Sequence, residues 1–204
     1  HPIAYRLNQD QDELIKRKEQ KSVALLPGSR KSEISLLADE MIKAAKELRR
    51  NDESYKFYMP LSDKKHLDLI KEPLEDLVKV SFNNSQEVLS NCEIGIITSG
   101  TATLEASLLR TPCVTLYKTG WLSYRLIKPL LQIDHFSLPN LLAGRELLPE
   151  LLQDEVNVKN IINAIEKISL KGLDYYYKEF HAIHENLKAG SSETAAKEIS
   201  YLID

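Results

Sequence analysis

Short apolar runs alternate with longer, partly charged segments along most of the chain. Five of these runs have the length and the β-branched content of buried strands: 22–26, 55–60, 77–80, 93–97 and 111–117. Helix-forming segments separate them. This alternation predicts an α/β fold in which a Rossmann-like parallel sheet carries helices on both faces, with right-handed crossovers.

The remaining segments are predicted to be mostly helical. Residues 1–20 are expected to form a connection and a linker helix, residues 21–170 the α/β domain, and residues 171–204 C-terminal helices that pack on a companion domain or subunit. Helices are predicted at 147–153, 156–168 and 175–187. Ala189–Glu193 is expected to end one helix and cap the last.

Two predicted strand ends carry turns suited to an anion. Ser99-Gly100-Thr101 joins the fourth strand to a helix, and Pro27-Gly28-Ser29-Arg30 joins the first strand to another. The backbone N–H groups of a helix N-terminus attract anions, and small residues let a phosphate approach them. Arg30 adds a guanidinium with two donor edges. Because parallel strands end at one edge of the sheet, the two turns predict one phosphate site, and Glu105 lies one helical turn into the second helix.

Two further segments carry candidate chemistry. Between Ala106 and Ile133 the only charged residues are basic, and Trp121–Lys128 combines them with aromatic and aliphatic residues. This composition suits either a core helix with solvated basic residues or a helix on an anionic membrane surface. Ser137–Glu146 is expected to be a Pro- and Gly-bounded loop that brings Asn140 and Arg145 together.

Composition narrows the classes of function. A net charge of −3 argues against a nucleic-acid binder. Cys92 and Cys113 lie in or beside apolar runs without metal-ligand spacing, so we expect buried, reduced thiols. His181 and His184 are three apart but lack companions, so no metal site is expected. The chain begins at His1 and has neither a secretory signal nor an apolar run of about 20 residues, and we expect it to be part of a longer protein.

Three motifs together resemble the carboxyl-terminal half of the lipid-A-disaccharide synthase family, inverting glycosyltransferases with two Rossmann-like domains (the GT-B type). They are Leu25-Leu26-Pro27-Gly28-Ser29-Arg30 followed by Glu33-Ile34, then Ser99-Gly100-Thr101-Ala102-Thr103-Leu104-Glu105, and Leu138-Pro139-Asn140-Leu141-Leu142-Ala143-Gly144-Arg145. The second motif is shared loosely by many nucleotide-sugar enzymes. The third is the most specific.

The resemblance implies a reaction and its partners. The family joins UDP-2,3-diacylglucosamine to 2,3-diacylglucosamine 1-phosphate, forming lipid A disaccharide 1-phosphate and UDP, without a metal or another cofactor. The donor-binding half is expected here. The acceptor site and the general base are expected in an amino-terminal domain that this chain lacks, so the chain alone is expected to be inactive. A homodimer and a cytoplasmic location on the inner face of the inner membrane of a Gram-negative bacterium are also implied.

The resemblance also implies roles for individual residues. Arg30 and Asn140 are expected to stabilise the leaving diphosphate, and Glu105 to bind the ribose hydroxyls. The expected UDP-binding set is Gly28, Ser29, Arg30, Met59, Pro60, Leu61, Ser99, Gly100, Thr101, Glu105, Asn140 and Arg145. Met59–Leu61 is expected near the uracil, whereas the separate roles of Asn140 and Arg145 stay open.

Two alternative functions remain. One is another UDP-sugar enzyme of the same architecture, such as a 2-epimerase or a muramyl-type N-acetylglucosaminyltransferase, although the Pro139–Arg145 string argues against it. The other is a non-catalytic nucleotide-binding module, which the lack of a recognisable acid/base residue favours. Restored activity on adding the missing half would discriminate between an enzyme and a module.

Overall fold

A six-stranded parallel sheet forms the centre of the molecule in the computed structural model, which describes Leu7 and residues 10–120 and 135–203, the last fourteen as backbone only. The strands are β1 (Glu19–Leu26), β2 (Lys56–Leu61), β3 (Val78–Phe82), β4 (Cys92–Thr98), β5 (Cys113–Tyr117) and β6 (Glu150–Leu152). Their order is β3-β2-β1-β4-β5-β6. The predicted Rossmann-like α/β class is confirmed.

The strand order places a topological switch between β1 and β4. From β1 the chain moves to β2 on one side, whereas from β4 it moves to β5 on the other side. Leu26 at the end of β1 pairs with Ile97 near the end of β4, so the turns after both strands leave the sheet side by side. In open α/β sheets such a switch is where ligands bind.

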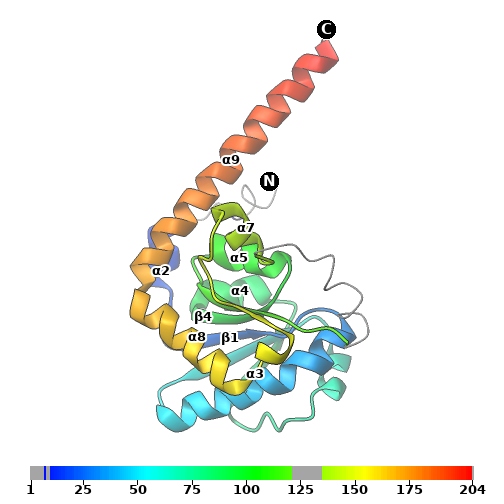
Figure 1. The fold of residues 1–204 in the computed structure, drawn as a ribbon, viewed down its shortest axis with the longest axis vertical. Coiled ribbons are helices and arrows are strands. Elements are labelled where there is room, and N and C mark those ends of the chain that lie inside the picture. The colour runs from blue at the N-terminus through cyan, green and yellow to red at the C-terminus, as the bar shows by residue number, and fades with distance from the viewer. Residues whose placement is uncertain (1–6, 8–9, 121–134, 204) are drawn as a thin grey trace.

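Helices cover both faces of the sheet, as Figure 1 shows. Those of the domain are α3 (Lys31–Asn51), α4 (Ser85–Asn91), α5 (Thr101–Leu108) and α8 (Val158–Lys171). Helices α3 and α8 pack on each other, and α4 packs on α5. Right-handed crossovers that run in opposite directions from the switch put α3 and α5 on opposite faces.

Burial explains why the strands read as continuous apolar runs. Residues Val23–Leu26 of β1 are all buried, as are Ile94–Thr98 of β4. Strands covered on both faces cannot alternate polar and apolar residues, because both rows of side chains enter the core. The two cysteines are free and buried, and burial raises the pKa of each thiol to about 12, so neither is a reactive nucleophile.

The segment expected to be a linker is tied into the domain. Asp10 caps the short helix α2 (Gln11–Lys16). The partly buried Lys18 then donates from its Nζ to Leu89 O at 2.7 Å, Leu109 O at 2.9 Å and Thr111 Oγ1 at 2.6 Å. These acceptors lie at the C-terminal ends of α4 and α5, where helix dipoles favour a cation. Lys18 thereby joins two helices of one face to the start of β1.

Two predictions of secondary structure are wrong. The predicted helix at 147–153 is instead β6 and the start of the 3-10 turn η3 (Gln153–Glu155), because β6 pairs with β5 in register from Thr115 and Glu150 onward. The segment after β2 forms the 3-10 helix η1 (Lys64–Leu69). The predicted break at 189–193 is absent, since α9 (Leu173–Ile203) is continuous, and one glycine costs a helix only about 1 kcal/mol.

The loop after β5 contains a short helix that sequence did not predict, α7 (Leu138–Ala143), which packs on α5 and α9. The distal part of α9 projects away from the domain (Figure 1). Within the described ranges no helix is long and apolar enough to span a bilayer. The predicted membrane-facing segment, Trp121–Lys128, lies outside the described residues.

Candidate functional site: a cavity at the switch point

A cavity of about 640 Å³ opens where β1 and β4 end. Its walls come from the turns after four neighbouring strands. The lining residues are Leu26, Gly28, Ser29, Arg30, Glu33, Pro60, Leu61, Ser62, Asn83, Ser85, Thr98, Ser99, Gly100, Thr101, Ala102 and Glu105. Of the twelve residues expected to bind UDP, the structure brings nine to this cavity.

The turn between β4 and α5 offers backbone donors that no described residue accepts from. Gly100 has φ 154° and ψ −162°, a backbone conformation that is essentially restricted to glycine. No hydrogen bond from the backbone N–H of Gly100, Thr101 or Ala102 is formed within the described part of the chain. These groups open onto the cavity at the positive end of α5, which suits an anion.

Thr98 adds a further polar atom that has no partner among the described residues. Its side-chain Oγ1 is buried at the cavity lining and makes no hydrogen bond among the described residues. Buried hydroxyl groups are normally paired, so an unpaired one at a cavity points to a ligand or water that completes it. Ser99 contributes less than expected, because its backbone N–H already donates to Leu116 O at 2.8 Å.

The turn between β1 and α3 is already occupied by a carboxylate of the chain itself. Glu33 Oε2 accepts from the backbone N–H groups of Ser29 and Arg30, each at 3.2 Å. Its other oxygen, Oε1, accepts from Arg30 Nη1 at 3.0 Å. The Arg30 side chain is 81% exposed and Glu33 only 19%, so the guanidinium stands at the mouth of the cavity above a nearly buried carboxylate.

Glu105 lies on the cavity wall four residues after Thr101, so one face of α5 carries both. Pro60 and Leu61 also line the cavity, at the end of β2, whereas Met59 is fully buried behind them. Sequence reasoning missed Ser62, Asn83 and Ser85. Each lies within three residues of the end of β2 or β3, and the rule that ligands bind beyond the carboxyl ends of strands could have found them.

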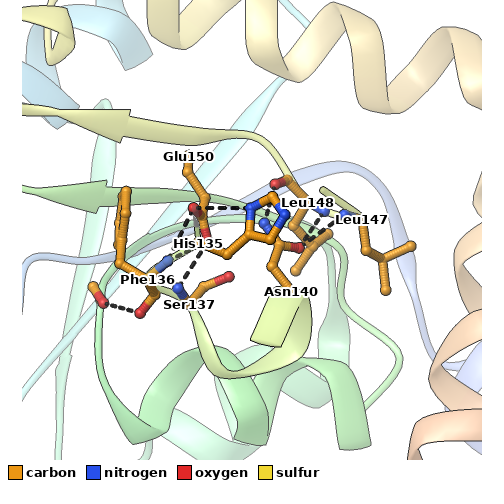
Figure 2. Close-up of polar contacts among 8 residues, drawn as sticks. His135, Phe136, Ser137, Asn140, Leu147, Leu148 and Glu150 are labelled. Atoms are coloured by element: carbon orange, nitrogen blue, oxygen red, sulfur yellow. Dashed lines mark hydrogen bonds and ion pairs between the residues drawn. The ribbon is translucent and has the colours of Figure 1, made fainter. Parts of the chain in front are cut away.

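Asn140 lies outside the lining of the cavity and is completely buried. Its Oδ1 accepts from the backbone N–H groups of Leu147 at 2.9 Å and Leu148 at 2.8 Å, and its Nδ2 donates to Leu148 O at 2.8 Å. Figure 2 shows this clamp, which fixes α7 against the segment that leads into β6. The expected contact of Asn140 with the diphosphate gains no support from this geometry.

Arg145 also lies outside the cavity lining. Its guanidinium donates to Tyr175 Oη at 2.9 Å and pairs with Glu179 Oε2 at 2.7 Å. Both partners belong to α9, so Arg145 fastens the end of the loop to the C-terminal helix. The third motif therefore acts in this structure as a support, and not as a lining of the cavity.

Glu150, which sequence reasoning missed, connects this support to the cavity. Its carboxylate accepts from Ser137 N at 2.7 Å and from Phe136 N at 3.1 Å, and it lies 3.8 Å from the Nδ1 atom of His135 (Figure 2). The carbonyl of Phe136 in turn accepts from Ser99 Oγ at 3.2 Å. A hydrogen-bonded chain thus runs from Glu150 in β6 through Phe136 to Ser99 in the turn after β4.

The comparisons with known proteins agree with this architecture. The profile of a family described as lipid-A-disaccharide synthetase matches residues 1–203. The chain belongs to this family. It is 36% identical over 217 residues to the lipid-A-disaccharide synthase of Pseudoalteromonas translucida, covering 100% of this chain and 56% of that protein. The enzyme of Colwellia psychrerythraea is 32% identical over 210 residues, covering 98% of this chain and 53% of that protein.

The chain therefore spans about half the length of these relatives of the synthetase family. Among solved structures, Staphylococcus aureus TarM in a complex that includes UDP superposes with a TM-score of 0.51 at 16% identity, covering 83% of this chain and 32% of that one. That likeness concerns the fold alone. Within the described residues no three His, Cys, Asp or Glu side chains form a group that could hold a metal ion.

Proposed function

We propose that this chain is the donor-binding half of an inverting glycosyltransferase that joins UDP-2,3-diacylglucosamine to 2,3-diacylglucosamine 1-phosphate. The products are lipid A disaccharide 1-phosphate and UDP. The observation that carries the proposal is the cavity at the switch point, which Arg30 also lines and where three N–H groups and the Thr98 hydroxyl have no hydrogen-bond partner among the described residues. Membership of the synthetase family supplies the substrate class.

The reaction explains why such a cavity is needed. An acceptor hydroxyl oxygen attacks the anomeric carbon, and the bond from that carbon to the β-phosphate oxygen breaks with inversion. The electron pair stays on the departing UDP, and the proton of the hydroxyl passes to a base that we place in the other half of the enzyme. Fixed donors that face the growing charge on UDP lower the barrier without consuming a proton.

Each part of the cavity then has a proposed role. The Gly100–Ala102 N–H groups and Arg30 would hold the diphosphate, and Glu105 would accept hydrogen bonds from the ribose hydroxyls. Pro60 and Leu61, with Ser62 beside them, would lie along the uracil. Asn140 and Arg145 would act through the loop that they fasten, since neither lines the cavity.

A titration calorimetry experiment on the full chain tests the proposal, with uridine and pyrophosphate as matched ligands. UDP is expected to bind with a Kd below about 1 mM, and each fragment ligand more weakly, because the cavity would contact both parts of UDP. A flat UDP titration at millimolar concentration would mean that no donor site is preformed in this chain. Equal dissociation constants for uridine and UDP would contradict the proposed contact between the diphosphate and the N–H groups of the turn after β4.

The location and partners of the enzyme are also proposals. We propose that the protein works at the inner face of the bacterial inner membrane, since both substrates carry acyl chains and Trp121–Lys128 is basic and aromatic. A companion amino-terminal domain would supply the acceptor site, and a homodimer is a further proposal. Vesicle binding that survives changing Arg125 and Lys128 to Glu would contradict the membrane contact.

A further inference from the structure

The carboxylate of Glu33 occupies the place in the β1–α3 turn that an external anion would need. It takes the N–H groups of Ser29 and Arg30, and an added Cβ on Gly28 would lie 2.3 Å from Glu33 Oε2. The carboxylate is thus packed directly over the glycine. Across the cavity, the N–H groups of Gly100–Ala102 form no hydrogen bond within the described residues. An incoming phosphate therefore has one vacant set of backbone donors, not two.

Glu33 also holds the guanidinium of Arg30, which lines the same cavity as this vacant turn. Among the described residues Arg30 makes a single side-chain hydrogen bond, from Nη1 to Glu33 Oε1 at 3.0 Å. A guanidinium carries five N–H donors, so the remaining edge stays available at the mouth of the cavity. An exposed arginine side chain samples many rotamers. One fixed contact limits these rotamers in the free protein, so less side-chain entropy is lost when a ligand binds.

We propose that Glu33 is a positioning residue for donor binding: it fixes Arg30 at the cavity mouth and confines the diphosphate to the Gly100–Ala102 turn. This inference rests on the proposed function, in which the cavity holds UDP. Two alternative roles of Glu33 predict different effects of its replacement on UDP binding. If its charge merely opposed the phosphates, removing that charge would strengthen UDP binding. If it only capped α3, its effect on binding would not depend on Arg30.

The variant Glu33→Gln separates these roles. An amide oxygen can still accept from the Ser29 and Arg30 N–H groups, as glutamine does in capping boxes, but the charge that holds the guanidinium is lost. The matched control is Glu47→Gln at the other end of α3. Glu47 Oε1 pairs with Arg50 Nη2 at 2.5 Å in an equivalent i,i+3 contact that is not part of the cavity lining.

The experiment measures UDP dissociation constants by ligand-detected NMR, which reaches weak binding, for the full chain and for the variants E33Q, R30A, R30A/E33Q and E47Q. We expect E33Q to weaken UDP binding about three- to fivefold, as befits a partly exposed ion pair. The same change should have no effect in the R30A background. E47Q should leave the Kd unchanged, and both single Gln variants should keep the Tm of the parent chain.

Three results would overturn the inference. E33Q that binds UDP as tightly as the parent, or more tightly, would show that the charge does not organise the site. An equal weakening by E33Q with and without Arg30 would reduce Glu33 to a helix cap. A parent chain that does not bind UDP at all would overturn the proposed function itself, and this result is distinct from the other two.

Discussion

The turns after β1 and β4 lie at the same edge of the sheet, and each contains a glycine with positive φ and leads into a helix. They differ in whether their backbone N–H groups already have an acceptor. Gly28 (φ 107°) lies against the carboxylate of Glu33, whereas an added Cβ on Gly100 (φ 154°) would meet nothing within 4 Å. One turn is closed by an internal anion and the other is open to an external one. The same local pattern can therefore serve structure in one place and ligand binding in another.

The largest expected effect concerns these two glycines. Gly28→Ala should lower the free energy of unfolding by about 3–4 kcal/mol, because strain at positive φ adds to a collision with Glu33 and the loss of its hydrogen bonds. Gly100→Ala should cost about 1–2 kcal/mol, from backbone strain alone, but should remove UDP binding. Urea unfolding and calorimetry measure the two quantities.

Gly172→Ala is the matched control for this pair. Gly172 also has positive φ (84°) and open space around its Cα, and it is not part of the cavity lining. The substitution Gly172→Ala should lower the free energy of unfolding about as much as Gly100→Ala does and should leave UDP binding unchanged. If Gly28→Ala were no worse than Gly172→Ala, the difference between the two turns would not be real.

Arg30 belongs to the turn after β1 and lines the cavity, so its removal tests how much it stabilises the charge on the leaving group. In the complete two-domain enzyme, Arg30→Ala should lower kcat about a hundredfold, equivalent to about 3 kcal/mol of transition-state stabilisation. Arg50→Ala, at the other end of α3, should change it little. Near-normal turnover of the Arg30 variant would leave the N–H groups of the open turn as the only proposed donors.

The last effect, the smallest at any one pH step, is a pH dependence at the far end of the helix that carries the open turn. Burial lowers the pKa of the Lys18 ammonium to about 7 from its usual value near 10.5. Between those two pH values the unfolded chain binds more protons at Lys18 than the folded chain does. The free energy of unfolding therefore rises as pH rises from about 7, and it falls as pH is lowered through this range.

The stability of the parent chain relative to Lys18→Met should therefore increase over that range, by at most about 1.4 kcal/mol per pH unit. Denaturant unfolding at several pH values measures the slope. Lys16→Met is a suitable control, since Lys16 lies in α2, two residues away, and takes no part in the contacts that Lys18 makes. Parallel stability curves for the parent and Lys18→Met would show that Lys18 keeps its proton.

Much of the candidate site could be predicted because it depends on local patterns. Strand, glycine turn and helix follow each other within a few residues at Leu26–Lys31 and at Thr98–Thr101, and all parallel strands end at one edge. The role of Glu33 had a local signal too, since it stands at the third position of α3 where carboxylates cap a helix. Asn140 had none, because its three partners are defined only when α7 meets the segment before β6.

The sequence by itself determined the class of fold, the five longer strands and the two turns, because buried parallel strands need continuous apolar runs and turns at positive φ need glycine. Only the tertiary structure decided that residues 150–152 form a sixth strand. Three residues are too short to show a hydrophobic periodicity, and this strand depends on β5 for its hydrogen bonds. The tertiary structure also decided which turn is open. That depends on whether each N–H group meets an acceptor in space, and such a meeting is a property of the packed molecule.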